Sequence, residues 1–473
     1  MSPDEFIYMC LLLVSIPLGL LVKNSKTAFS KKLISSGSGV TLVVTLCRLH
    51  SLHSLITTLG TCLIVKVGGW RHCHKLAFVW CFGYIAFFRT VHWFGLPYPP
   101  SFANAVQLLL TLRMVGMTFE IHDSNSAKVN QIGQSDAATS KKPPVVIIDE
   151  PSVLDIFHYA YCYVGIMTGP YYKYKTYYDM IHNDNSSEIP ILKPFLQRLK
   201  YVALYGSMFI ISSHYITIQY AMTDEFYSYS SWFTTFYMVP MFFVFRTRMY
   251  SAWVLSECVC VMSTLGAYPA SSKPKCGQGP TIEIPKDSDK DKTVDDYYSF
   301  ETIHNISGYS CDFTATFRDA MRWWNMTVQW WLANFIYRRV TNRAWRTSVT
   351  MLVSAFWHGV HPGYYLSFMT VPIMLYAEDI MIKVFRRPSN EKMYDWLNWF
   401  VRMRFFEYLS MAFLLLKMDY TLTYWKSTFF IGHALSATFI VLGMAFKPQR
   451  KEKIDTDTTR TDETKLIEEK KEK

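Results

Sequence analysis

Charged residues are scarce in this chain of 473 residues. Asp, Glu, Lys and Arg together make up 18% of it, whereas apolar residues make up 50% and aromatic residues 16%. A soluble domain carries about 25% charged residues. Because the few charges here are gathered in short stretches, the composition excludes an ordinary soluble protein and indicates a membrane protein.

The sequence also lacks the basic arms with interleaved aromatic residues that nucleic-acid-binding proteins use. The formal net charge is +11, but lysines and arginines cluster beside apolar runs, at Lys23 to Lys32 and Lys447 to Lys453. Such clusters are typical of the cytoplasmic flanks of membrane segments. We therefore expect no nucleic-acid partner, and we expect the lipid bilayer to surround most of the chain.

Several enzyme signatures are absent. None of the 13 histidines is followed by an aspartate five residues later, which argues against the soluble type of glycerolipid acyltransferase. No Gly-x-Ser-x-Gly elbow, Walker loop or dinucleotide fingerprint occurs. The cluster Arg71 to His74 has no second half at zinc-like spacing, and the cysteines lie mostly inside apolar segments. We predict no metal and no cofactor.

The chain has instead a series of apolar runs of membrane-spanning length. The first, Phe6 to Val22, would be about 26 Å long as a helix, and no cleavage site follows it. We count roughly ten to twelve such segments. Because backbone groups in lipid must be hydrogen-bonded within their own segment, we predict an all-α fold, a polytopic integral membrane helical bundle.

Three polar stretches interrupt this pattern, at residues 119–150, 269–300 and 447–473. They are predicted to be loops or disordered segments. The chain thus divides into a multi-span domain, residues 1–446, and a charged tail, residues 447–473, which we expect in the cytosol. The tail ends Lys470-Lys471-Glu472-Lys473, similar to the dilysine address that returns proteins to the endoplasmic reticulum.

The segment from Ser348 to Tyr365 is the strongest candidate for chemistry, because it places a histidine inside an apolar run. Pro362 follows His358 closely, and this predicts a broken helix that lines a cavity. A neutral imidazole can accept a proton from an alcohol, so His358 suits a general base. A hydrogen-bonded structural histidine is the alternative, and His361 is the rival position. Spacing alone leaves these possibilities open.

Upstream, residues 321–332 form a tryptophan-rich stretch with polar residues every three to four positions. This pattern predicts an amphipathic helix at the membrane interface. On that basis Asn325 is either a polar residue at the boundary or the start of a glycosylation sequon with Thr327.

These motifs resemble those of the membrane-bound O-acyltransferase family. Its mark is a membrane-embedded histidine in Trp-His-Gly-x-x-Pro-Gly-Tyr, which residues 357–364 match at every fixed position. A Trp-Asn-x-Thr block matches residues 324–327. Further stretches, at residues 57–61 and 163–170, resemble the members that acylate lysophosphatidylinositol in animals. A basic-aromatic block matches Arg248, Tyr250, Trp253 and Glu257.

The resemblance implies helices around a buried reaction chamber. The dilysine-like end of the tail predicts the endoplasmic reticulum membrane as the protein's location. The resemblance also implies transfer of a polyunsaturated acyl chain, arachidonoyl or eicosapentaenoyl in kind, from acyl-CoA to the sn-2 hydroxyl of lysophosphatidylinositol, as in phospholipid remodelling. His358 is then the base, Asn325 the second catalytic residue, and acyl-CoA a co-substrate. A lysophospholipid with a choline or serine headgroup is the alternative acceptor. A membrane transporter is the alternative of another class.

Other residues are candidates for substrate binding. Arg246, Arg248 and Arg322 could pair with the phosphates of CoA or inositol, or they could simply reach the membrane surface as flanking residues do. The remaining candidates come from the matched motifs and from the turn after His358: Trp324, Trp357, Gly363, Tyr364, Tyr365, Tyr250, Trp253 and Glu257.

Overall fold

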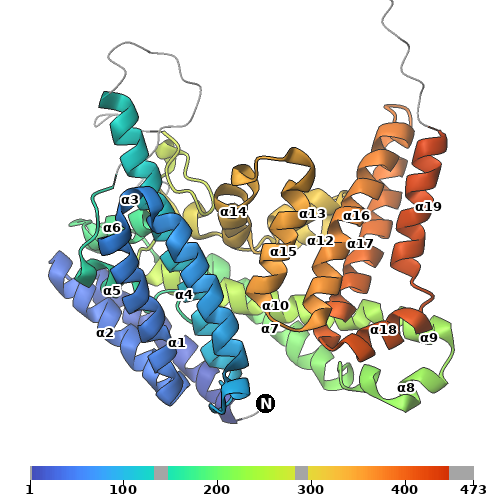
Figure 1. The fold of residues 1–473 in the computed structure, drawn as a ribbon, viewed down its shortest axis with the longest axis horizontal. Helices are drawn as coiled ribbons and strands as arrows, with labels where there is room; N and C mark the ends of the chain where they lie inside the picture. Colours follow the sequence, from blue (N-terminus) through green and yellow to red (C-terminus); the bar gives the residue numbers. More distant parts are fainter. Residues whose placement is uncertain (1–2, 133–147, 283–296, 447–473) are drawn as a thin grey trace, which may run out of the picture.

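The computed structural model describes residues 3–132, 148–282 and 297–446. Helices dominate this part of the chain, and two strands of two residues each form a small antiparallel sheet (Figure 1). Together with the long apolar helices, this architecture confirms the predicted all-α membrane fold. The strands are β1 (Tyr268–Pro269) and β2 (Tyr298–Ser299), with Tyr268 opposite Ser299.

An N-terminal group of helices forms one side of the molecule (Figure 1). Its two longest helices, α3 and α4, pack along each other. Helix α3 bends at Gly69, whose φ of 59° lies in the left-handed region that glycine adopts without strain. The group consists of α1 (Pro3–Lys23), α2 (Ala28–Cys47), α3 (Ser51–Thr90), α4 (Ser101–Ile132), α5 (Val153–Ala160) and α6 (Tyr174–Ile181).

A C-terminal group forms the opposite side, and two long helices, α7 and α10, cross beneath both groups (Figure 1). Helix α10 packs against α7, α1 and α17, so it joins the two groups. Four helices, α12 to α15, lie between the groups. The elements are α7 (Leu192–Tyr215), α8 (Asp224–Ser228), α9 (Ser231–Phe236), α10 (Met238–Met262), α12 (Gly308–Phe313), α13 (Phe317–Trp323), α14 (Met326–Phe335), α15 (Arg346–His358), α16 (Pro362–Phe385), α17 (Glu391–Leu415), α18 (Met418–Ser427) and α19 (Ile431–Ala445).

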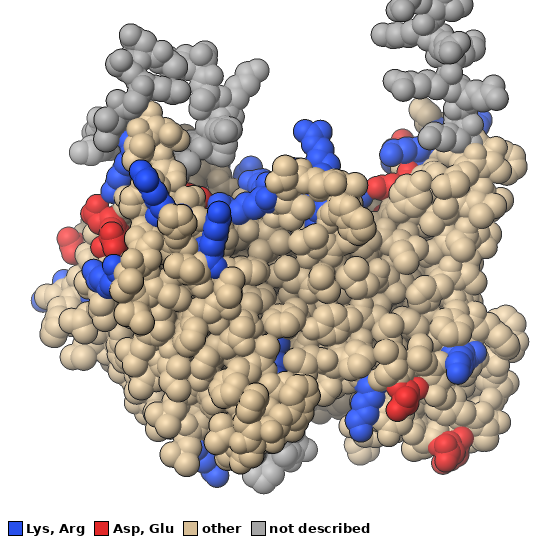
Figure 2. Space-filling model, in the orientation of Figure 1, with Lys and Arg blue, Asp and Glu red and all other residues tan. Residues whose placement is uncertain are grey.

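The surface seen in Figure 2 has a broad band with few charges, and most charged side chains lie towards its upper and lower edges. In the described part of the chain, three segments are long and apolar enough to cross a membrane, and α18 with α19 adds a bent fourth. Helices α7, α10, α16 and α17 reach 24 or 25 residues, but none of them contains an uninterrupted stretch apolar enough to count as a span on its own. The count of ten to twelve membrane segments therefore stays a prediction.

Two large hydrophobic cores occupy the two sides of the molecule. The N-terminal core draws on α1 to α6 and also takes in Trp331 of α14 and Trp357 of α15. The C-terminal core is built around α16 and α17 and includes Met374 and Phe405. The end of α15 lies where these two cores meet, since Trp357 belongs to the first and Phe368, just beyond the turn, packs against the second.

The predicted loops are only partly right. Residues 119–132 continue helix α4 instead of forming a loop, because Phe119 and Ile121 still pack into the N-terminal core and tertiary burial outweighs the local polarity. The stretch 269–300 holds the small sheet at its ends. Residues 133–147 and 283–296, and the charged tail 447–473, lie outside the described residues.

Candidate active site

Helix α15 breaks directly after His358, as the sequence predicted. Helix α16 begins at Pro362, and the Gly363 N–H donates to the carbonyl of Leu416 at 2.7 Å. Both glycines of the turn permit close approaches. A Cβ on Gly359 would lie 2.4 Å from the ring of Tyr364, and one on Gly363 would lie 2.3 Å from a backbone oxygen of α17. The turn therefore requires glycine at both positions.

The imidazole of His358 is held between aromatic rings. Its centroid lies 5.1 Å from Phe368 in a stacked arrangement and 5.1 Å from Phe413 edge-on, with Tyr364 at 5.8 Å and Trp357 at 4.7 Å. Across the described residues, no protein group hydrogen-bonds to either ring nitrogen. A purely structural histidine would normally have such a partner. The arrangement fixes the ring, and its role as the base stays a prediction.

His361 lies in a different environment. It immediately precedes α16 and approaches the ring of Tyr364 at 6.3 Å. Tyr364 is one of the four rings that form the aromatic box around His358, and the other three have no ring contact with His361 in the described residues. In the ranges that the structure covers, no group of three or more His, Cys, Asp or Glu residues could hold a metal ion. The pair of histidines therefore has no visible third ligand there, and the absence of a metal remains a prediction.

The tryptophan-rich stretch is not one helix, so that prediction was wrong. Helix α13 ends at Trp323 and α14 begins at Met326, with Asn325 between them at φ 47° and ψ 53°. Asparagine tolerates this left-handed conformation better than most residues. The carbonyl of Asn325 accepts the N–H groups of Val328 and Gln329, while its side-chain amide has no protein partner in the part of the chain described.

Asn305 supports the break at Asn325. Its carbonyl accepts the Met326 N–H at 2.7 Å, and its side-chain oxygen accepts the N–H and hydroxyl of Thr327 at 3.2 and 2.6 Å. Asn305 itself begins a glycosylation sequon, Asn305-Ile306-Ser307, but it is 1% exposed and therefore not accessible to a glycan. Thr327 is equally engaged, so the alternative of a glycosylation sequon at Asn325 does not fit the structure.

Glu257, a predicted substrate-binding residue, is buried beneath this support. One carboxylate oxygen accepts the N–H groups of Asn305 and Ile306 at 2.7 and 3.4 Å, and the other accepts Nε of Arg198 at 2.9 Å. The carboxylate is 2% exposed and is fully used by protein groups. The structure thus places Glu257 where it fixes the segment that carries Asn325.

The predicted aromatic residues gather around Trp324. Its ring meets Trp253 edge-on at 5.2 Å and Tyr250 at 5.7 Å. Trp324 also lies 5.9 Å from Phe245, which lies 5.5 Å from Phe413. Since Phe413 packs on His358, a continuous series of ring contacts joins the Asn325 block to the histidine motif.

The three candidate arginines differ in their surroundings. Arg246 pairs with Asp312 at 3.0 Å, and the Tyr250 hydroxyl donates to the same carboxylate at 3.0 Å. Arg322 pairs with Asp319 of its own helix at 2.8 Å, and its side chain is 70% exposed. Arg248 is exposed and has no ion pair within the described ranges. A substrate-binding role for any of the three stays a prediction.

The remaining predicted residues shape the turn. Trp357 is buried and its indole N–H donates to the carbonyl of Leu108 at 3.0 Å, so it anchors α15 to α4. Tyr364 closes over Gly359, and Tyr365 is half-buried in the first turn of α16. Phe413 and Arg89 also belong to the surroundings of His358, but the sequence did not predict them. An arginine inside an apolar run is the signal that would have found Arg89, whose contacts are described below.

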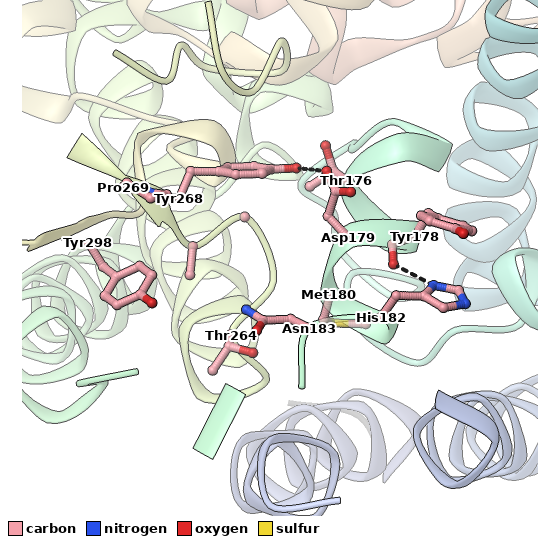
Figure 3. A pocket seen from close by; sticks show the side chains of 12 residues that line it. Thr176, Tyr178, Asp179, Met180, His182, Asn183, Thr264, Tyr268, Pro269 and Tyr298 are labelled. Atoms are coloured by element: carbon pink, nitrogen blue, oxygen red, sulfur yellow. Dashed lines mark hydrogen bonds between the residues drawn. The ribbon is translucent and has the colours of Figure 1, made fainter. Parts of the chain in front are cut away.

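One cleft lies apart from this site. It has a volume of about 460 Å³ and lies between α6 and the segment before β1 (Figure 3). Tyr268 donates to Asp179 at 2.8 Å across it, and the His182 ring bonds to the carbonyl of Tyr178 at 2.9 Å. None of the predicted site residues lines this cleft, so the buried reaction chamber around His358 stays a prediction.

Comparison with known proteins gives consistent results. Residues 37–418 match the family described as "MBOAT, membrane-bound O-acyltransferase family". The membrane-bound acylglycerophosphatidylinositol O-acyltransferase mboat7 of Xenopus laevis is 44% identical over 463 residues, which cover 95% of this chain and 96% of the relative. The corresponding human protein, MBOAT7, is 42% identical over 94% of both chains, and frj of Drosophila melanogaster is 34% identical over 95% of this chain and 94% of its own length.

The matched range, residues 37–418, includes Asn325 and His358 at the two helix breaks and the aromatic residues that lie between them. It also sets aside the transporter alternative, because the family and the similar proteins are named for acyl transfer. This chain belongs to the membrane-bound O-acyltransferase family and is a multi-pass membrane acyltransferase.

Proposed function

We propose that this enzyme transfers a polyunsaturated acyl group from acyl-CoA to the sn-2 hydroxyl of lysophosphatidylinositol. The inositol headgroup is supported by the names of the similar proteins from frog, human and fly. The observation that carries the chemistry is the pair of broken helices. Each presents a side chain without a protein hydrogen-bond partner in the described residues, His358 at one break and Asn325 at the other.

The proposed mechanism is direct transfer. His358 accepts the proton of the lysolipid hydroxyl as its oxygen attacks the thioester carbonyl, and negative charge develops on the carbonyl oxygen. The amide of Asn325 donates a hydrogen bond to that oxyanion, without the cost of a buried charge. Collapse of the intermediate breaks the C–S bond, and the imidazolium returns its proton to the CoA thiolate. Acyl-CoA is consumed as a co-substrate, and the reaction requires no metal.

Headgroup choice is tested by competition. Purified enzyme is given lysophosphatidylinositol, lysophosphatidylcholine and lysophosphatidylserine at equal concentrations with arachidonoyl-CoA, and the products are resolved by mass spectrometry. We expect phosphatidylinositol to be the main product. The same reaction with saturated and polyunsaturated acyl-CoA mixtures tests the donor. Preference for choline or serine would refute the proposed acceptor.

Charge asymmetry supports a cytosolic C-terminus. Two helical segments, α2 and the first half of α3, lie between the α1–α2 turn and the bend of α3, so the turn and the bend share one side of the membrane. The bend lies towards the same edge of the molecule as the end of α19 (Figure 1). On the other side, the α2–α3 turn contains one arginine, Arg48, and residues 91–100 between α3 and α4 contain no lysine or arginine. Positive turns face the cytosol. The basic residues at the α1–α2 turn and at the bend of α3 are Lys23, Lys26, Lys31, Lys32, Lys66, Arg71 and Lys75.

Asn185 begins a glycosylation sequon, Asn185-Ser186-Ser187, and no glycan is expected there when the protein is made in eukaryotic cells. The loop that carries it is bound to the basic α1–α2 turn, because Lys23 donates to the carbonyl of Ser187 and Lys31 to that of Asn183, each at 2.5 Å. Glycosidase treatment should leave the gel mobility unchanged, and a tag after Lys473 should be accessible when only the plasma membrane is permeabilised. A glycan at Asn185 would place this turn in the lumen and reverse the orientation. Co-localisation with endoplasmic reticulum markers tests the compartment.

A further inference from the structure

The C-terminus of α15 leaves backbone carbonyls that the helix cannot satisfy. The Gly359 N–H still bonds to the carbonyl of Ala355 at 3.0 Å, but the chain then leaves the helix. Pro362, at the start of the next helix, has no N–H. Inside a membrane, water is not available to replace these bonds, so the last carbonyls need another donor.

Arg89, at the end of α3, supplies that donor. One terminal nitrogen of its guanidinium donates to the carbonyl of Phe356 at 2.8 Å, and the other donates to those of Trp357 and His358 at 2.5 and 3.1 Å. The side chain is only 8% exposed. Three successive carbonyls, the last of them belonging to His358, are therefore held by one rigid group.

The guanidinium is itself oriented by α4. Its Nε donates to the side-chain oxygen of Asn104 at 3.0 Å. Throughout the described ranges, no carboxylate pairs with Arg89. Its positive charge therefore faces the negative end of the α15 dipole, which is a favourable arrangement. A planar group with a fixed fork of donors can reach all three carbonyls, whereas a lysine ammonium is a single point.

The position of this contact matters because His358 is the last residue of α15. Its ring packs on Phe368 and Phe413, which belong to the C-terminal helices α16 and α17, whereas Arg89 and Asn104 belong to the N-terminal group. The guanidinium thus fixes the helix end against one group while the ring lies against the other. A small shift of this end would move the imidazole relative to both substrates.

We propose that Arg89 is a positioning residue for acyl transfer, which holds the end of α15 so that the His358 imidazole meets the acceptor hydroxyl, and that Asn104 orients Arg89. This inference rests on the proposed role of His358 as the base. It predicts an effect on the chemical step, because the arginine bonds to backbone atoms of α15 and not to a substrate. Misplacement of a catalytic group by about 1 Å can cost about 10²-fold in rate.

The test compares Arg89→Lys with Arg113→Lys in purified enzyme. Arg113 is a matched control, since it is a second buried arginine that donates to backbone carbonyls, namely those of Tyr159, Ala160, Cys162 and Val164. For Arg89→Lys we expect kcat to fall about 10²-fold with KM for both substrates within about twofold. For Arg113→Lys, kcat per folded molecule should change less than threefold, roughly. Equal kcat losses in both, or a loss confined to KM, would overturn the proposal.

A second pair of variants serves if Arg89→Lys does not fold. Asn104→Leu removes the acceptor for Nε and should lower kcat about tenfold, while Asn104→Asp keeps an acceptor and should stay near the parent rate. Equal rates for these two variants would overturn the proposal. A wrong role for His358 would give a different result from a wrong role for Arg89. If His358 is not the base, His358→Ala remains active, whatever the rate of the Arg89 variants.

Discussion

Replacing His358 with alanine is expected to lower the rate of acyl transfer by about 10³-fold or more, within the range that a general base contributes. The imidazole is the group at the α15 break that can accept the hydroxyl proton, and its nitrogens have no protein partner in the described residues. The rate is measured as phospholipid formed per folded enzyme molecule. Because the ring contributes to a box of aromatic contacts, folding is checked by size-exclusion chromatography and thermal unfolding.

His361→Ala is the matched control for this variant. It removes an imidazole three residues away that stands outside the aromatic box. We expect this variant to keep the rate within about threefold of the parent enzyme. If His361→Ala silences the enzyme and His358→Ala does not, the base assignment is wrong. Isolation of an acylated enzyme would reject direct transfer.

Replacing Asn325 with glycine is expected to lower kcat by about 10²-fold, the scale on which loss of one oxyanion donor acts. Glycine is the informative choice because Asn325 has a φ of 47°. It keeps the left-handed backbone and removes only the amide. Alanine would add strain of about 1–2 kcal/mol and would confuse folding with chemistry. Single-turnover measurements separate the chemical step from product release.

Asn325→Asp tests whether the side chain donates to the oxyanion, as proposed, or instead positions the acyl-CoA by accepting a hydrogen bond. Aspartate tolerates the left-handed conformation and has the same shape, but its carboxylate cannot donate to an oxyanion. If Asn325 acts as a donor, both the aspartate and the glycine variants should be slow. An aspartate variant with the parent rate would show that the side chain acts as an acceptor, and a glycine variant with the parent rate would remove Asn325 from the mechanism.

The break at His358 was predictable because its causes are local. Pro362 lacks the N–H that a continuing helix needs, and Gly359 is required by the ring of Tyr364, five residues further on. Only the requirement for glycine at Gly363 comes from a distant segment, helix α17. The apolar runs likewise predicted the membrane and the first helix, α1. In these cases the chain's own composition determines the structure, since lipid leaves the backbone few alternatives.

The break at Asn325 was not predictable from the local pattern. Its periodicity suits one continuous helix, but Asn305 bonds to the backbone after the break and Glu257 fixes Asn305 in turn. These partners lie some 20 and 70 residues earlier in the sequence. Helix propensity is a weak local preference, and buried hydrogen bonds from distant residues outweigh it. The same reasoning applies to α4, whose polar end is helical because it packs against the core.

By itself, the sequence determined that this is a helical membrane protein and that a histidine follows an apolar helix and precedes a proline-glycine turn. These features follow from the composition and from the period of the apolar residues, whose structural consequences depend only on the surrounding lipid and on neighbouring residues. The tertiary structure alone decided which distant groups stand beside His358: the ring of Phe413 from α17, and an arginine from α3 on the carbonyls of its helix. The arginine contacts join residues more than 260 positions apart, and no local pattern encodes such a pairing.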